Sequence, residues 1–325
     1  MCVEGENIAE SEEVMRKYFE IIDGRLTPTE NENSRIVVFI NPSEIERLYL
    51  VGELNLDEHT LSSALDPDEL SRVEFEPEHV AVIFKRPRHY SDGDDFLFRI
   101  CSMGLYLFKD RLIAVLSDDI TIFDHGKDVS NIIGGLREVL LRLIARSISQ
   151  FLGHIRAISM IVDELEKKLE TSMSNKHLMH LFRLSQSMTY YLSAISSNGV
   201  LIDKLRANSA KIGFTSEHEE QLDDLSVDNT QCYKQAEIYS VIMSGMNDAR
   251  ASMVNNNLNI LMKRLTVLSI LFLPMNVIAG IFGMSEYTEF TKNVIPLPYA
   301  YLLFVLGLFV VGYFTFWLLK RTGFD

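Results

Sequence analysis

The chain has 325 residues, a formal net charge of −14 at pH 7 and three cysteines, Cys2, Cys101 and Cys232. The cysteines share no close spacing, which argues against a disulfide framework and against a thiolate zinc site. From residue 265 onward three acidic residues balance three basic ones, so the excess negative charge lies in residues 1–264. Such an acidic region disfavours nucleic-acid binding and suits divalent cations, although a merely solvated surface would carry the same charge.

The N-terminal part of the chain reads as an α+β region. The first residues are acidic and have no apolar run, so no signal peptide is expected. An amphipathic pattern up to residue 30 predicts a short helix, and β-branched and aromatic runs predict strands at 35–40, 47–52, 72–85 and 96–115. Residues 61–70 predict a short helix broken at Pro67. Residues 1–130 are therefore expected to form a cytoplasmic domain, a mixed sheet with helices.

The pattern becomes helical after residue 131. Apolar residues at three- and four-residue steps predict helices over 132–172 and 177–208, within a helical segment 131–215. A third helix is expected to begin at residue 216 after the break at Gly213. No proline occurs between Pro87 and Pro274. The third helix can therefore run to residue 282, which is about 100 Å at 1.5 Å per residue.

Two segments, residues 265–282 and 299–319, are apolar enough to cross a bilayer, which needs about 20 helical residues. Basic residues lie outside the pair, so both termini are expected in the cytoplasm and the short link outside. A hairpin this small cannot enclose a pore alone, so it either oligomerises or anchors the rest of the chain. The expected parts are a stalk helix 216–264, a first membrane helix 265–285, an external loop 286–298, a second membrane helix 299–319 and a cytoplasmic tail 320–325.

Polar and small residues recur at heptad spacing along the third helix. One row is Asp248, Asn255, Met262, Ser269 and Asn276, and the adjoining row is Ser252, Asn259, Thr266, Leu273 and Gly280. A packed coiled coil would have leucine and isoleucine there, and polar groups within a bilayer usually face a bundle interior or a water-filled path. The alternative is that these residues tighten helix packing in lipid, with Asn276 satisfying the backbone group that Pro274 frees.

The segment from Asn259 to Met284, which includes Pro274, Asn276 and Gly280, resembles the first membrane helix of the CorA family of divalent-cation channels. Residues 72–85 and 104–113 are similar to strands of that family's soluble domain. The family usually has asparagine after Gly-Met, whereas this chain has Ser285. The resemblance implies a funnel-shaped homopentamer that transports Mg²⁺, and the serine leaves selectivity for magnesium open.

The resemblance also implies roles for residues along the membrane helix. Gly283, Met284 and Ser285 would form the outer mouth, with Glu286 and Glu289 concentrating cations. Pore lining would come from Asn255, Asn259, Met262, Leu265, Thr266, Ser269, Leu273, Asn276 and Gly280. Met262 is the better candidate for a gate, because Leu265 can equally be the start of the lipid-facing helix. A ring of Asp248, which is also a candidate ligand for a regulatory cation, would lie below the gate.

The family's regulatory cation site is expected to be altered in this chain. One ligand position corresponds to Asp224, which could equally be a solvated acid beside Asp223. The partner positions are Ser62 and Ser63, which have no carboxylates. The acidic residues within a turn or two that could replace them are Asp66, Asp68 and Glu69.

Taken together, these features predict a pentameric Mg²⁺ channel of the inner or plasma membrane, spanning it more than once, with gating by intracellular cation. One alternative is a Zn²⁺, Co²⁺ or Ni²⁺ transporter of the same fold. Another is a non-conducting membrane-anchored scaffold. No nucleophile–base pair, phosphate-binding glycine loop or complete metal set suggests an enzyme, and no nucleic-acid partner is expected.

Overall fold

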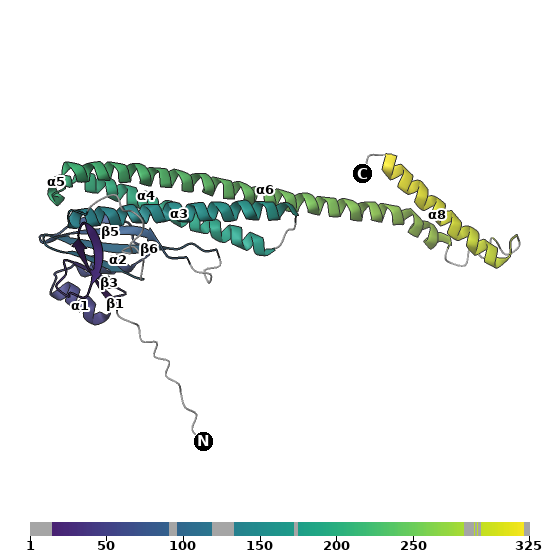
Figure 1. Ribbon diagram of the computed structural model, residues 1–325. Coiled ribbons are helices and arrows are strands. Elements are labelled where there is room, and N and C mark those ends of the chain that lie inside the picture. The colour runs from purple at the N-terminus through teal and green to yellow at the C-terminus, as the bar shows by residue number, and fades with distance from the viewer. Residues whose placement is uncertain are drawn as a thin grey trace, which may run out of the picture. The chain divides into compact units, whose positions relative to one another are not determined.

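The computed structural model of the chain describes residues 15–90, 96–118, 133–171, 175–282, 289, 291 and 294–321. The chain divides into two compact units, Met1–Met246 and Asn247–Asp325. The first contains a sheet with helices on both faces, and the second contains the end of one very long helix and a further helix (Figure 1). The finer division into domains that the sequence suggests stays a prediction.

A seven-stranded mixed sheet is the centre of the first unit. Its order is β2-β1-β3-β7-β6-β5-β4, and β3 pairs with β7 in parallel while the other neighbours are antiparallel. The strands are β1 (Met15–Ile22), β2 (Arg25–Thr29), β3 (Ile36–Ile40), β4 (Arg72–Phe75), β5 (His79–Pro87), β6 (Ile100–Phe108) and β7 (Leu112–Leu116). The central strands have apolar side chains on both faces because helices cover both of them.

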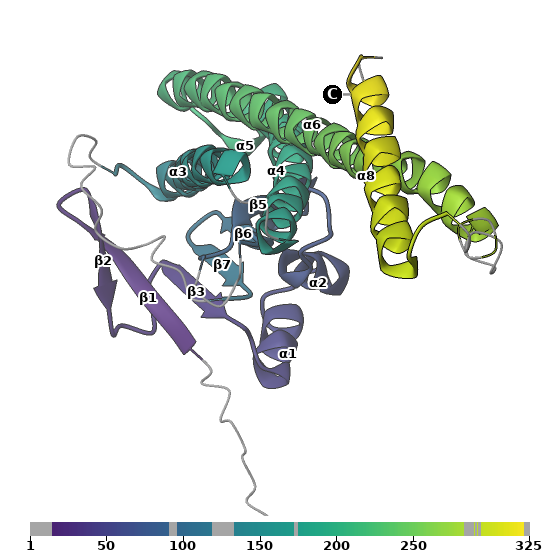
Figure 2. The same ribbon diagram turned by 90° about the vertical axis from the view of Figure 1, so that its right-hand side faces the viewer.

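Long helices cover one face of the sheet and short helices cover the other (Figure 2). The larger core joins Val38, Phe84 and Leu105 of the sheet to α3 (Leu136–Thr171), α4 (Asn175–Ala207) and the first part of α6 (Ser216–Phe282). The smaller core joins Phe39, Ile83 and Tyr106 to α1 (Glu44–Gly52) and α2 (Glu58–Leu65). A four-residue helix, α5 (Ser209–Ile212), ends at Gly213, which has a positive φ of 78°.

The helix expected before residue 30 is wrong, because β1 and β2 form a hairpin there. Asp23 and Gly24 make its turn, with φ values of 49° and 71°, and Ile22 pairs with Arg25 across it. Two consecutive residues with positive φ are typical of a type I′ hairpin turn, for which Asp-Gly is a preferred sequence. The Asp-Gly pair is therefore the sequence signal for a hairpin, and it outweighs the amphipathic pattern that favoured a helix.

The strand expected at 47–52 is also wrong, since these residues belong to α1. Ser43 accepts a hydrogen bond from the Glu46 backbone N–H, and the Glu46 carboxylate accepts one from the Ser43 backbone N–H at 3.0 Å. This reciprocal capping box starts a helix despite the apolar run that follows it. Glu46 is buried and also pairs with Arg16 of β1, which fixes α1 to the sheet.

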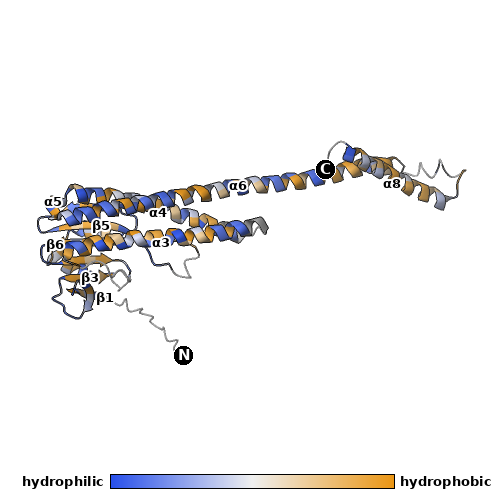
Figure 3. Ribbon diagram, turned by 45° about the horizontal axis from the view of Figure 1, so that its top comes forward, coloured by the Kyte–Doolittle hydropathy of each residue, from blue (hydrophilic) through white to orange (hydrophobic). Residues whose placement is uncertain are grey.

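The second unit contains two helices of membrane-spanning length. An 18-residue stretch of α6 has a mean hydropathy of 1.8, and one of α8 (Leu297–Arg321) has 2.4. Apolar residues dominate both segments (Figure 3). At the end of α8, the Arg321 guanidinium lies 5.4 Å from the Trp317 ring centroid, an arrangement suited to a membrane–water interface.

Candidate functional site

The polar stripe of α6 lies on one exposed face of the helix. Thr266, Ser269 and Asn276 are exposed, and the apolar members Met262 and Leu273 are 63% and 68% exposed. At about 100° per residue, the stripe from residue 262 to residue 280 spans only roughly 80° of the helix. The earlier residues on this face, Asp248, Asn255 and Asn259, are exposed as well, as are Leu265 and Gly280.

The opposite face of α6 packs against α8. Val267, Leu271 and Ile278 are half-buried and lie roughly 180° around the helix from the stripe. A Cβ placed on Gly312 of α8 would lie 3.2 Å from the Met275 sulfur, so the two helices approach closely at a small residue. The half-buried and buried positions of α8 recur at three- and four-residue steps: Ala300, Phe304, Leu308, Val311, Gly312, Thr315 and Leu319. Packing within the hairpin therefore leaves the stripe uncovered.

Oxygen atoms are available along the stripe. The Thr266 hydroxyl donates to the Met262 carbonyl at 2.8 Å, so its lone pairs stay free to accept. Pro274 lies inside α6 and has no N–H to donate to the Ile270 carbonyl. Asn276 follows two residues later and adds an exposed amide. The stripe thus offers hydroxyl and amide oxygens, which are ligand atoms that hard cations prefer, and the freed Ile270 carbonyl lies beside the stripe, about 80° from its centre.

The outer mouth falls mostly outside the part of the chain that the structure describes. Gly283, Met284, Ser285 and Glu286 are not among the described residues, whereas Glu289 is described and exposed. The roles expected for these residues stay predictions.

In the first unit, the expected regulatory positions lie on α2 and on the segment between α2 and β4. Asp57 caps α2: its carboxylate accepts from the Thr60 backbone N–H at 2.8 Å, and this bond lowers the pKa of Asp57. Ser62 is exposed and Ser63 is buried. Asp66 and Asp68 are both exposed, and the Asp66 carboxylate accepts from the Asp68 backbone N–H at 2.8 Å.

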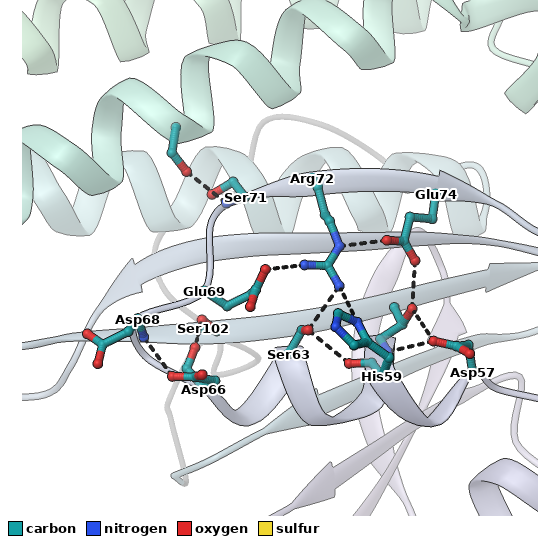
Figure 4. Close-up of polar contacts among 12 residues, drawn as sticks. Asp57, His59, Ser63, Asp66, Asp68, Glu69, Ser71, Arg72, Glu74 and Ser102 are labelled. Atoms are coloured by element: carbon teal, nitrogen blue, oxygen red, sulfur yellow. Dashed lines mark hydrogen bonds and ion pairs between the residues drawn. The ribbon is translucent and has the colours of Figure 1, made fainter.

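Arg72 is the centre of this cluster (Figure 4). Its guanidinium pairs with Glu69 and donates to the Glu74 carboxylate at 2.6 Å. It also donates to the Ser63 hydroxyl at 2.9 Å and lies 3.1 Å from Nδ1 of His59. A cationic side chain of the same chain therefore already compensates Glu69, whereas Asp66 and Asp68 remain turned to solvent.

The ammonium group of Lys85 is a second positive charge close to the segment between α2 and β4. Its ammonium is buried and donates to the Pro67 carbonyl at 2.6 Å and to the Ser102 hydroxyl at 2.8 Å. Ser102 in turn donates to the Asp66 carbonyl. Burial lowers the pKa of Lys85 to about 8, although the carboxylates of the loop oppose this shift. Further along, the Ser71 backbone N–H donates to the Ser197 hydroxyl at 2.8 Å, which ties the loop to α4.

Asp224 lies on α6 and is exposed, while its neighbour Asp223 accepts a hydrogen bond from Arg206 at 2.8 Å. Within the described residues, no three His, Cys, Asp or Glu side chains of one chain could hold a metal ion together. A cation site built from Asp224 and the loop carboxylates would therefore need ligands from a second copy. The sequence reasoning missed Arg72 and Lys85. Their partners are close in the sequence but belong to different elements: those of Arg72 come from α2, β4 and the loop between them, and those of Lys85 come from that loop and from β6.

An α+β unit, followed in sequence by two helices of membrane-spanning length with an exposed polar face, defines a membrane protein with the layout of an ion transporter. The sequence profile described as "CorA-like Mg2+ transporter protein" matches residues 31–321. The chain belongs to this family, whose members are divalent-cation transporters and not enzymes.

The curated relative "Cobalt/magnesium transport protein CorA" from Methanocaldococcus jannaschii is 25% identical over 323 residues, which covers 93% of this chain and 96% of the relative. The complete structure of the CorA magnesium transporter from that organism aligns with a TM-score of 0.76 at 20% identity, over 95% of this chain and 98% of its own. The full-length CmaX structure aligns with a TM-score of 0.68 at 16% identity, over 94% and 96%. These likenesses confirm the fold that the sequence predicts: a mixed sheet, a long helix and two membrane helices.

Proposed function

We propose that the chain forms a homopentamer in which the α6 helices line a path for Mg²⁺ across the inner or plasma membrane. The observation that carries this proposal is the polar stripe on α6, exposed on the face opposite α8. Both termini are on the cytoplasmic side in this arrangement, because Lys263, Arg264, Lys320 and Arg321 flank the two membrane segments.

The cost of polar groups in lipid supports an oligomer over a lone hairpin. An amide or hydroxyl without a partner in hydrocarbon costs roughly 2–7 kcal/mol. Ser269 and Asn276 would face lipid in a single copy, because α8 packs on the other side of α6. Thr266 would face lipid too, but its hydroxyl already bonds to the Met262 carbonyl, so its cost is smaller. Copies arranged around an axis remove this cost by turning the stripe inward, where each position becomes a ring of oxygen atoms around water.

The gate is proposed at Met262, the apolar member of the stripe at its cytoplasmic end. Its side chain is exposed in one copy, and so is that of Leu265. A ring of methionines makes the neck narrow and apolar, so water leaves it. A hydrated cation cannot cross the dry neck, and the path is closed. The carboxylates of Asp248 form an acidic ring on the cytoplasmic side of this neck and attract cations to it.

The outer mouth is proposed at residues 283–286, with Glu289 nearby. Mg²⁺ keeps much of its hydration shell, so hydroxyl and carbonyl groups bind it through its waters. Ser285 is shorter than asparagine and gives a wider ring with weaker contacts. The acidic residues Glu286 and Glu289 compensate by raising the local cation concentration.

The regulatory cation site is proposed between copies, with Asp224 of one copy and the exposed Asp66 and Asp68 of another as ligands. Glu69 contributes less, because Arg72 already pairs with it. With Ser62 and Ser63 in place of two carboxylates, the site is weak and needs high concentrations of Mg²⁺.

Cobalt is the second ion to test, since the curated relative from Methanocaldococcus jannaschii is named for cobalt and magnesium. The experiment is uptake of Mg²⁺, Co²⁺ and Zn²⁺ by the purified chain in liposomes. We expect uptake of Mg²⁺ above that of protein-free liposomes, with Co²⁺ competing. Transport of Co²⁺ or Zn²⁺ without Mg²⁺ would replace the proposed ion. No uptake of any of the three by an intact oligomer would support a scaffold instead.

A further inference from the structure

The segment between α2 and β4, residues 66–71, carries the two exposed carboxylates of the proposed regulatory site, those of Asp66 and Asp68. This segment, here called the acidic loop, forms neither a helix nor a strand. Surface loops are commonly mobile, because fixing each residue costs conformational free energy. In this chain, however, hydrogen bonds from the sheet and from α4 hold the acidic loop at both of its ends.

The start of the acidic loop is held by the side chain of Lys85. The Lys85 ammonium donates to the Pro67 carbonyl at 2.6 Å and to the Ser102 hydroxyl at 2.8 Å. Ser102 in turn donates to the Asp66 carbonyl (Figure 4). Lys85 of β5 and Ser102 of β6 are opposite each other in the sheet, so their side chains lie on the same face. Two consecutive carbonyls of the loop are thereby bound to the sheet.

The end of the acidic loop is held by two neighbouring residues of α4. The Ser71 backbone N–H donates to the Ser197 hydroxyl at 2.8 Å. The Ser71 hydroxyl donates to Oδ1 of Asn198 at 2.7 Å. Asn198 is fully buried and Ser71 is nearly so, so water does not compete for the bond between their side chains.

The same Asn198 amide also binds the backbone of Lys85. Its Oδ1 accepts from the Lys85 N–H at 2.9 Å, and its Nδ2 donates to the Lys85 carbonyl at 2.9 Å. β4 begins at Arg72, opposite Ile83 of β5, and so does not reach Lys85. The Asn198 amide takes the place of a strand residue there, because it offers one acceptor and one donor, as a backbone residue does. The contacts that hold the two ends of the loop therefore meet at Lys85.

We propose that Asn198 and Lys85 are positioning residues for the regulatory cation: they keep the acidic loop rigid, so that Asp66 and Asp68 face solvent in a fixed arrangement. This inference rests on the regulatory site proposed above. A mobile loop must be ordered when it binds an ion, and this lowers its affinity, whereas a loop that is already ordered avoids that cost. The effect matters in this chain because two of the expected ligand positions are serines.

Asn198 is the better residue to test, because it is neutral and its replacement leaves the charge around the loop unchanged. Ser197→Ala is the milder variant and removes one bond to Ser71. Ser187→Ala is matched to it, since Ser187 also lies on α4 and also accepts a backbone N–H, that of Phe98, at 2.9 Å. The bond of Ser187 lies just before β6 and not at the acidic loop.

The first measurement is hydrogen exchange of the full-length protein in detergent without added Mg²⁺, followed by mass spectrometry on peptides that cover residues 66–75. Asn198→Ala should speed exchange in the acidic loop about tenfold or more, because the loop end and the backbone of Lys85 lose their partner. Ser197→Ala should speed it less, and Ser187→Ala should leave it unchanged.

The second measurement is the Mg²⁺ concentration that gives half of the protection against proteolysis, at constant ionic strength, together with the midpoint of thermal unfolding. Asn198→Ala should raise this concentration about tenfold and Ser197→Ala about threefold. Ser187→Ala should not change it, although all three variants should unfold at lower temperature. A purely structural role of Asn198 would lower the unfolding midpoint and leave the Mg²⁺ concentration unchanged.

Unchanged exchange of the acidic loop in both Asn198→Ala and Ser197→Ala would overturn the proposal. It is also overturned if neither variant needs more Mg²⁺, or if Ser187→Ala shifts either measurement as far as Ser197→Ala does. A wild-type protein that Mg²⁺ does not protect at any concentration would overturn the regulatory site itself. The exchange measurement, which contains no Mg²⁺, separates that failure from a failure of Asn198 to fix the loop.

Discussion

The polar groups of the two units differ in burial and in pairing. In the first unit, the buried cations Lys85 and Arg86 find partners within their own chain: Lys85 bonds to Pro67 and Ser102, and Arg86 pairs with Asp118. In the second unit, the polar residues of the α6 stripe are exposed, although they lie in a segment apolar enough to span a membrane. The first unit therefore pairs these two buried cations within a single copy, although Nε of Arg86 has no partner of its own, whereas the exposed stripe of the second unit calls for further copies around it.

The same contrast holds for the apolar side chains. Val82, Phe84 and Met103 of the sheet are fully buried in the larger core under the long helices. In α8, only one seam of residues is covered, and Leu302, Phe309 and Tyr313 are more than 60% exposed. A surface this apolar is compatible with lipid or with neighbouring helices and not with water. The predictions below test whether the two units respond to substitution as differently as this comparison requires.

The largest effect is expected from Asn276→Leu in the second unit. A ring of leucines in place of amides makes the path apolar at this level, so cation flux should fall more than tenfold while the oligomer stays intact. Uptake by liposomes measures the flux, and size-exclusion chromatography measures assembly. Val310→Leu is the control, because Val310 is exposed on α8 and lies away from the stripe.

Normal flux through the Asn276→Leu protein would remove Asn276 from the path. Loss of assembly would assign Asn276 to packing between copies, which is the alternative that the sequence leaves open.

In the first unit, Gly104→Ala should destabilise the fold by about 1–3 kcal/mol through overpacking. A Cβ at residue 104 of β6 would lie 2.5 Å from the Cβ of Ala64, so α2 could not keep its place on the sheet. Gly153→Ala in α3 is the control: nothing lies within 4 Å of its Cβ, and replacing a glycine inside a helix by alanine should stabilise by about 0.5–1 kcal/mol. Urea unfolding followed by circular dichroism compares the two, and equal midpoints would contradict the close contact of α2 with β6.

A smaller effect is expected from the titration of Lys85. Its pKa is about 8 in the folded chain against 10.5 for an ordinary lysine, so the unfolded chain binds more protons between these values. Stability contributed by this group therefore rises with pH from about 8 to about 10.5, by an amount on the order of 1–3 kcal/mol. The buried thiols Cys101 and Cys232 have raised pKa values and act in the opposite direction.

The difference between the wild type and Lys85→Met isolates the lysine, because both proteins keep the thiols. Urea unfolding at several pH values between 7.5 and 10 should show a steeper rise of stability in the wild type than in the variant. Parallel pH profiles would mean that Lys85 stays charged in the folded protein throughout this range.

Much of this architecture could be read from the sequence because it depends on local patterns. The bounds of α6, Ser216–Phe282, agree with those predicted from the break at Gly213, the absence of proline and the end of the apolar run. The strands β5, β6 and β7 also follow from their apolar runs. The two errors, at β1 and α1, arose where a turn or a cap of two or four residues outweighed a longer pattern.

The side-chain contacts around the candidate sites could not be predicted from the sequence. The Arg72 cluster joins α2, β4 and the loop between them, and the Lys85 contacts join β5, β6 and that loop. Nothing in the spacing of these residues indicates that a guanidinium pairs with Glu69. The position of α8 relative to the stripe was similarly hidden, since it depends on the close approach of Gly312 to Met275.

The smallest effect is expected at Asp224, because the proposed regulatory site is weak. Mg²⁺ shifts the channel toward its closed state only by the difference between its affinities for the closed and the open state. With Ser62 and Ser63 at two ligand positions and Glu69 paired with Arg72, protection of the cytoplasmic part against proteolysis should require millimolar Mg²⁺. Asp224→Ala should abolish this protection, whereas Asp223→Ala should preserve it, because Asp223 pairs with Arg206 in its own chain. Protection at micromolar Mg²⁺, or protection that survives Asp224→Ala, would show that other ligands hold the regulatory ion.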